Sequence, residues 1–294
     1  MGDTLNHFPL ASLRWIDKRY DNWMPNSRAL ICMRSTVRAA ILFVHGWSGN
    51  AGDTWEAFPR ALRFLPEAAD ADVFLLDYPS KKHSVAFCAA PLRVFLRDLL
   101  KEPISRIVNP SMPEGTDPRP TGMQYDRIVL VAHSMGAVVS RRALLDLDQD
   151  DELTLTEADR GKFRLLFFAP AHKGSSIPLI IRAGLGLDWL PGATLVGMAL
   201  EVHFRSLQDL KPRSDCLVTL EKDCKVARKA RTEAGESLDY LRAHVYHAQG
   251  DKVVVQDGFD RDYAMHPVMK KNHRSICKPD YEYRDPLEGL RAAL

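Results

Sequence analysis

The sequence predicts an α/β protein built on a doubly wound, mostly parallel sheet. Short, nearly continuous runs of branched and aromatic apolar residues recur along the chain, and segments with helical spacing separate them. Continuous apolar runs are typical of strands that are buried on both faces. The clearest runs are 39–44, 71–77, 128–131, 163–169 and 243–248. No internal repeat interrupts this order, so we expect a single domain over residues 1–294.

Composition narrows the class of protein. The chain has 294 residues, of which 46% are hydrophobic and 27% charged, as in a soluble globular protein. A net charge of +2 without a Lys/Arg run argues against nucleic acid as a partner. Five cysteines without a CxxC pair favour reduced thiols and a cytoplasmic location, and argue against a zinc site.

The first half of the chain supplies an edge and the first buried strands. Two short strand candidates, near Arg14–Ile16 and Ala29–Met33, would form an antiparallel edge. Helical periodicity covers 54–65, and Ser84 can cap a helix that continues to about Leu100. Residues 109–122 contain four prolines, which predicts a surface insertion without a core of its own.

The second half contains an apolar excursion at about 171–212, which we interpret as a cap. It follows the strand at 163–169, so it leaves the sheet at the carboxyl edge. Its part at 177–202 is a poor membrane span because charges, a proline and glycines interrupt it, but a weak contact with a membrane surface stays open. Helices are expected at 217–232 and 286–293.

The stretch Arg127–Gly136, RIVLVAHSMG, has the context of a nucleophile elbow. A buried strand runs into a tight turn with Ser134 at its apex, and a helical pattern follows. A serine hydroxyl is a weak nucleophile and must project from the backbone to where a base can reach it. Small neighbours make such a turn feasible, although Ala132 stands where the G-x-S-x-G motif has glycine. Ser134 is the candidate nucleophile.

A glycine turn after the first buried strand predicts donors for an oxyanion. Gly46 allows close approach of the backbone, and the next amide, that of Trp47, can donate. The amide of Met135, directly after the nucleophile, can supply the second donor. His45 is interpreted as a residue that organises this loop rather than as a base.

Two further segments supply a candidate acid and candidate bases. Asp251 follows the strand at 243–248, where a carboxylate can orient and stabilise an imidazole. The strand at 163–169 is followed by no acid, which favours Asp251. A base is expected from a late loop, and both His273 and His266 meet that condition. His133, inside the elbow, is interpreted as a packing residue.

The loop from His273 to Pro279 reads H-x-x-I-C-K-P. With AHSMG and HGWSGN, it resembles the α/β-hydrolase superfamily, and in particular lipase-like serine hydrolases of the branch that holds GPI-inositol-deacylase relatives. The resemblance runs from about Ala39 to Pro279. It implies the α/β-hydrolase fold with an apolar cap insertion. The resemblance implies that Ser134 is the nucleophile, Asp251 the acid and His273 the base, with the amides of Trp47 and Met135 as oxyanion donors.

The expected reaction is cleavage of a carboxylic ester through an acyl-enzyme, without a cofactor or a metal. The expected partner is a small-molecule or lipid ester, and the sequence does not indicate an oligomeric state. The alternative is an inactive binding or receptor module on the same fold, since superfamily motifs do not transfer a substrate or an activity.

Overall fold

The computed structural model describes residues 11–15, 24, 26–32, 37–102, 107, 123–150, 153–185, 204–236 and 239–294. Its described residues form an eight-stranded sheet in the order β1-β2-β4-β3-β5-β6-β7-β8. The six strands from β4 to β8 in this order run parallel, and β2 is antiparallel to both β1 and β4. The strands are β1 (Ala11–Trp15), β2 (Arg28–Cys32), β3 (Ala39–Val44), β4 (Ala71–Leu76), β5 (Arg127–His133), β6 (Phe163–Phe168), β7 (Ala243–Ala248) and β8 (His266–Val268).

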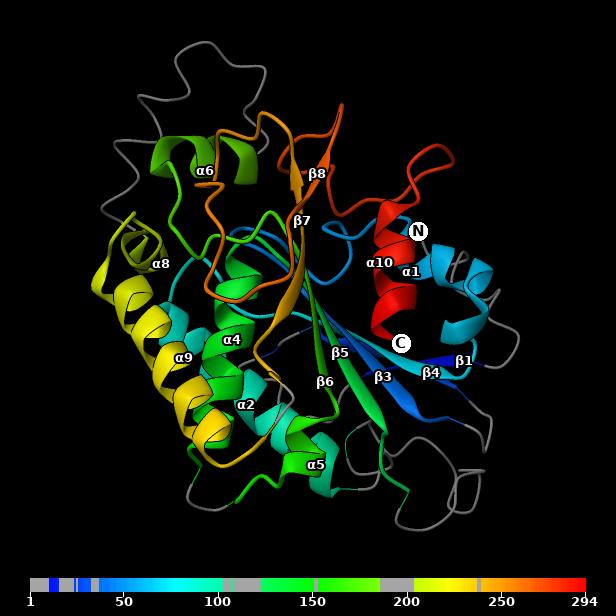
Figure 1. Ribbon diagram of the computed structural model, residues 1–294. Helices are drawn as coiled ribbons and strands as arrows, with labels where there is room; N and C mark the ends of the chain where they lie inside the picture. The colour runs from blue at the N-terminus through cyan, green and yellow to red at the C-terminus, as the bar shows by residue number, and fades with distance from the viewer. Residues whose placement is uncertain are drawn as a thin grey trace.

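Helices cover both faces of this sheet, as Figure 1 shows. One face carries α2 (Val85–Lys101), α4 (Met135–Asp148) and α9 (Asp215–Glu233), and the other carries α1 (Phe58–Ala61) and α10 (Asp285–Ala293). The central strands are therefore buried on both sides, which explains their continuous apolar sequences. The short helices α5 (Glu157–Arg160), α6 (Ile177–Gly184) and α8 (Arg205–Asp209) lie in the connections.

Most of the predicted elements are confirmed, including the α/β class and the antiparallel edge formed by β1 and β2. The expected cap of α2 is present, since the Ser84 side chain accepts a hydrogen bond from the backbone N–H of Phe87. The segment 54–65 begins as a turn and continues as α1 and a short 3₁₀ helix in place of one long helix. The predicted insertion at 109–122 lies outside the described residues.

One strand was missed. β8 pairs with the end of β7 in parallel and is only three residues long, with two of them exposed. A strand this short carries no alternation or apolar run that sequence could reveal. Its first residue, His266, was expected in a loop, and that expectation is wrong. Its ring stacks on Tyr246, with the centroids 4.8 Å apart.

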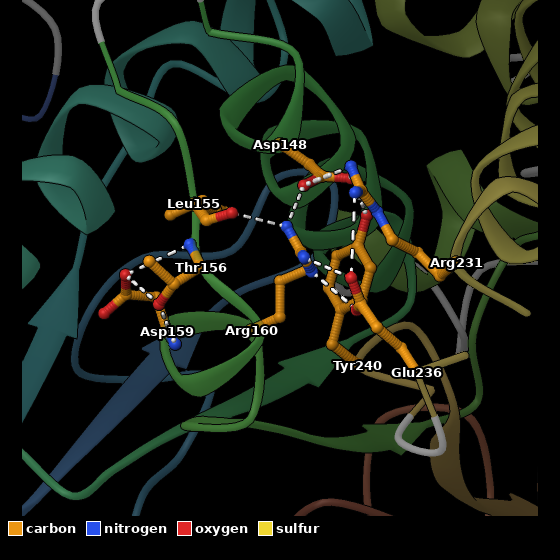
Figure 2. Close-up of polar contacts among 8 residues, drawn as sticks. All are labelled: Asp148, Leu155, Thr156, Asp159, Arg160, Arg231, Glu236 and Tyr240. Atoms are coloured by element: carbon orange, nitrogen blue, oxygen red, sulfur yellow. Dashed lines mark hydrogen bonds and ion pairs between the residues drawn. The ribbon is translucent and has the colours of Figure 1, made fainter. Parts of the chain in front are cut away.

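An ion-pair network fastens α9 and the segment after it to α4 and α5 (Figure 2). Asp148, at the end of α4, accepts from Arg160 at 3.1 Å, from Arg231 at 3.0 Å and from the Tyr240 hydroxyl at 2.9 Å. Arg160 also donates through Nε to Glu236 at 2.9 Å. Because α4 rises about 1.5 Å per residue from its start at the elbow, this network lies roughly 20 Å from the nucleophile turn.

The predicted cap is described only in part. α6 and α8 belong to it, whereas 186–203 lies outside the described residues and includes much of the apolar stretch. Within the described part of the chain, every helix is too short or too polar to cross a membrane.

Candidate active site

Ser134 lies at the sharp turn between β5 and α4, as the elbow motif predicts. Its backbone has φ 52° and ψ −119°, a conformation that a residue with a side chain rarely adopts. The end of β6 holds this strained turn, because the Ser134 N–H donates to the Phe168 carbonyl at 3.0 Å. The Ala171 N–H in turn donates to the Ser134 carbonyl at 3.3 Å. Strain of this kind persists only where the surroundings determine the backbone.

The two small residues of the elbow, Ala132 and Gly136, are small for different structural reasons. Ala132 lies in β5 and does not have a positive φ, so the missing first glycine of the motif leaves the turn intact. Gly136 faces the end of β3, where an added Cβ would lie 2.3 Å from the Val44 carbonyl oxygen and 2.4 Å from that of His45. Only the second position must therefore be glycine, because α4 passes directly over the backbone of β3.

The structure brings Ser134, His273 and Asp251 together in one hydrogen-bonded series. His273 Nε2 lies 3.1 Å from Ser134 Oγ, and His273 Nδ1 lies 2.9 Å from Asp251 Oδ2. The three residues come from three loops that follow β5, β7 and β8, all at the carboxyl end of the parallel sheet. The rival histidine, His266, is exposed on β8 and stacks on Tyr246 instead.

Asp251 is held as a carboxylate. Burial of its side chain would raise the pKa, but the hydrogen bond to His273, the charge of that histidine and the Val253 N–H together lower the pKa below its usual value. The Val253 N–H donates to Asp251 Oδ1 at 2.7 Å. An ionised acceptor fixes the proton of His273 on Nδ1 and leaves Nε2 free to accept from the serine hydroxyl.

The loop after β3 lies directly beside Ser134. His45 is buried within it; its Nδ1 lies 2.8 Å from the Gly46 carbonyl oxygen and its Nε2 lies 3.0 Å from Asp77 Oδ1. The Tyr78 ring stacks on His45, with the centroids 4.2 Å apart, and the Tyr78 hydroxyl donates to the His45 carbonyl. These contacts fit the expected role of His45 as an organiser of the loop.

Both predicted oxyanion donors lie close to Ser134. Met135 is the first residue of α4, and a helix leaves the N–H groups of its first turn without an internal acceptor. Trp47 lines the cavity that contains Ser134, whereas the Met135 side chain is buried. The close approach depends on Gly46, because an added Cβ there would lie 3.0 Å from the Cβ of Ser134.

A cavity of about 220 Å³ opens over Ser134. Its apolar side includes Ile180 and Ala183 of α6, and the Trp47 ring packs edge-on against Phe204 with the centroids 5.3 Å apart. The rest of its described lining is mostly polar. These polar residues are Ser48, Asn50, Asp53, Thr54, His133, His273, Arg274 and Lys278. The described wall of the cavity is therefore apolar on the α6 side and polar elsewhere.

Sequence reasoning missed the contact made by His133. Its Nε2 lies 2.7 Å from the backbone carbonyl oxygen of His273, 140 residues away in sequence. Burial and the nearby His273 lower the pKa of His133 to about 3, although its bond to the His273 carbonyl acts in the opposite direction. The expectation that His133 only packs is therefore incomplete. No local pattern distinguishes an elbow histidine that packs from one that bonds a distant loop.

The strand order, the elbow and the three side chains that meet above it define the α/β-hydrolase class of protein. The sequence model of the Alpha/beta hydrolase family matches residues 41–281, and the chain belongs to this family. A search of curated proteins found no match.

Solved structures share the fold at low identity. Carboxylesterase CesB from Bacillus subtilis is 12% identical with a TM-score of 0.52, and the match covers 99% of this chain and 95% of that chain. A peroxisomal alpha-beta-hydrolase from Saccharomyces cerevisiae is 11% identical with a TM-score of 0.51, covering 90% and 81%. The mature lipase BlEst2 from Bacillus licheniformis is 13% identical with a TM-score of 0.49, covering 88% and 94%. At these identities the likeness shows the fold alone.

Proposed function

We propose that the protein is a serine hydrolase that cleaves a carboxylic ester through an acyl-enzyme. The observation that carries this proposal is the series of two hydrogen bonds, 3.1 Å from His273 to Ser134 and 2.9 Å from His273 to Asp251. Both lengths allow direct proton transfer or orientation. A carboxylesterase and a lipase are among the structures that share the fold, which is compatible with this chemistry.

The mechanism follows from the proton positions. His273 Nε2 accepts the hydroxyl proton of Ser134 as the oxygen attacks the ester carbonyl. The imidazolium that forms is stabilised by Asp251, which donates no proton itself. The backbone amides of Trp47 and Met135 donate to the oxyanion of the tetrahedral intermediate. His273 then returns the proton to the leaving alcohol, and water, activated by the same nitrogen, hydrolyses the acyl-enzyme.

The acyl group enters the cavity toward α6. Each buried methylene contributes about 0.8 kcal/mol, so a pocket rewards chain length until it is full. A cap whose inner face lines the pocket predicts that kcat/KM for p-nitrophenyl esters rises from acetate to butyrate and to a medium chain. Ile180 and Ala183 are the described apolar side chains that a growing chain would meet first on α6. Leu187, which belongs to the predicted cap, lies outside the described residues.

The histidine loop supports a place near the GPI-inositol-deacylase relatives, because His273, Ile276, Cys277 and Lys278 carry that resemblance. A lipid ester is then one substrate class, with the enzyme in weak contact with a membrane surface. The five cysteines are thiols and form no disulfide with one another, which is compatible with the proposed cytoplasmic location.

Labelling by a fluorophosphonate probe tests the proposal directly. The probe reacts with an activated serine, so the parent protein should be labelled and Ser134→Ala should not, with thermal melting unchanged. Labelling that persists in a folded Ser134→Ala variant would remove Ser134 from its role. A parent protein that neither reacts with the probe nor hydrolyses p-nitrophenyl acetate would instead support the alternative, an inactive binding module on this fold.

A further inference from the structure

His133 occupies an unusual place, since its side chain reaches all three parts of the site. It belongs to the elbow, directly before Ser134. Its Nε2 lies 2.7 Å from the backbone carbonyl oxygen of His273, and the two imidazole rings have centroids 4.8 Å apart. On the other side, a Cβ added to Gly46 would lie 3.0 Å from His133 Nδ1, so the ring also abuts the oxyanion loop. The side chain is 8% exposed and lines the cavity.

The hydrogen bond decides where the proton of His133 lies. A carbonyl oxygen can only accept a hydrogen bond. His133 Nε2 therefore carries the proton, and its N–H donates a hydrogen bond to the backbone carbonyl oxygen of His273. Burial, reinforced by His273, lowers the pKa of His133 to about 3, so the ring stays neutral at the pH at which a histidine base works. The donor is therefore always present, and no second positive charge stands beside His273 when its imidazolium forms.

Other described hydrogen bonds of the histidine loop connect it to itself or to segments away from the elbow. The Asn272 side chain accepts from the N–H groups of Arg274 and Ser275, which organises the loop internally. Lys278 pairs with Glu56, and the Tyr283 hydroxyl donates to the Ile276 carbonyl at 2.7 Å. None of these bonds joins the loop backbone to the elbow directly, whereas the bond from His133 does.

We propose that His133 is a positioning residue of the proposed reaction: its Nε2–H holds the backbone of His273 at the distance from Ser134 that proton transfer requires. Asp251 orients the imidazole of His273 through a hydrogen bond to Nδ1. His133 fixes the position of the His273 backbone, from which that imidazole projects. A displacement of about 1 Å can reduce the rate on the order of 100-fold, so one bond at this point has a large effect. This inference rests on the proposed function.

Two substitutions separate the hydrogen bond from the shape of the ring. His133→Gln keeps an N–H donor at nearly the same reach, and His133→Phe keeps a ring without the donor. The matched control is His244→Phe, because His244 is a half-buried histidine whose ring stacks on Tyr263 at the start of β7. For each variant, kcat and KM for p-nitrophenyl acetate, the rate of fluorophosphonate labelling and thermal melting are measured.

We expect His133→Phe to lower kcat and the labelling rate on the order of 10–100-fold, with KM changed by no more than about twofold. His133→Gln should recover most of that loss, and His244→Phe should match the parent. If His133→Phe fails to melt cooperatively, His133→Met takes its place as the variant without a donor.

A folded His133→Phe variant with the parent's kcat would overturn the inference, as would a folded His133→Gln variant as slow as His133→Phe. In both cases the parent is active, so the proposed function survives. A parent protein without labelling or turnover would overturn the proposed function, and the positioning role with it.

Discussion

Substitution of Gly136 by alanine is the sharpest structural test of the elbow. The added Cβ would lie 2.3 Å from the Val44 carbonyl oxygen and 2.4 Å from that of His45, whereas ordinary contacts begin at 3.4 Å. Both obstacles are backbone, so no side chain can rotate away. Either α4 or the end of β3 must move by about 1 Å. Because the displaced strand leads directly into Gly46 and Trp47, the movement reaches the oxyanion loop.

Two magnitudes follow. Overpacking of a buried site costs about 1–3 kcal/mol, which for a domain of this size lowers Tm by roughly 2–6 °C. A displacement of about 1 Å between the nucleophile and the oxyanion donors reduces kcat on the order of 100-fold. The substitution should therefore harm activity far more than stability.

The matched control is Ala132→Gly, which completes the G-x-S-x-G motif at a position where the backbone needs no glycine. It should cost about 0.5–1 kcal/mol of stability, with little change in kcat. Thermal melting and p-nitrophenyl acetate hydrolysis of both variants provide the assay. A Gly136→Ala protein with the melting temperature and kcat of the parent would refute the idea that contact between α4 and β3 shapes the site.

Four further predictions address other parts of the molecule. Asp251→Asn should lower kcat on the order of 10³–10⁴-fold in ester hydrolysis, with exposed Asp257→Asn as a nearly silent control. The pKa of His133 is about 3, against about 6.5 in the unfolded chain, so only the unfolded chain takes up that proton as the pH falls between these values. The unfolding free energy should then fall by about 1.4 kcal/mol per pH unit from this group, and His133→Gln should flatten the slope in denaturant titrations. Asp148→Asn should destabilise the fold by about 3–5 kcal/mol and lower Tm by roughly 5–10 °C, because it removes the buried carboxylate that pairs with both Arg160 and Arg231. Ala183→Gln, on the α6 side of the cavity, should flatten the rise of kcat/KM with acyl length and keep activity on acetate.

Each of these four predictions can be contradicted by a specific result. Equal losses in Asp251→Asn and Asp257→Asn would show a general electrostatic effect rather than the orientation of His273. Identical pH slopes in the parent and His133→Gln would mean that the elbow histidine titrates in the folded protein. If Asp148→Asn leaves the melting temperature unchanged, the ion-pair network contributes little to stability because water screens it. If kcat/KM of the parent does not change with acyl length, the cap has a structural role and does not bind the acyl chain.

The sequence by itself determined most of the order of strands and helices, though not β8, and it determined the sharp turn around Ser134. Both depend on local signals. Apolar runs mark strands that are buried on both faces, and the elbow is a contiguous stretch whose small residues and serine are read directly. The antiparallel edge, the Ser84 cap and the family resemblance also came from residues that are close together in the chain.

Only the tertiary structure decided which distant residues meet. His273 and His266 both lie late in the chain, and only packing at the carboxyl ends of β5, β7 and β8 brings His273, and not His266, to Ser134. The bond from His133 to the His273 backbone spans 140 residues. The need for glycine at 136 and not at 132 arises from the backbone of β3. Contacts between distant segments depend on how far apart the folded elements come to rest, and no local period or motif encodes that distance.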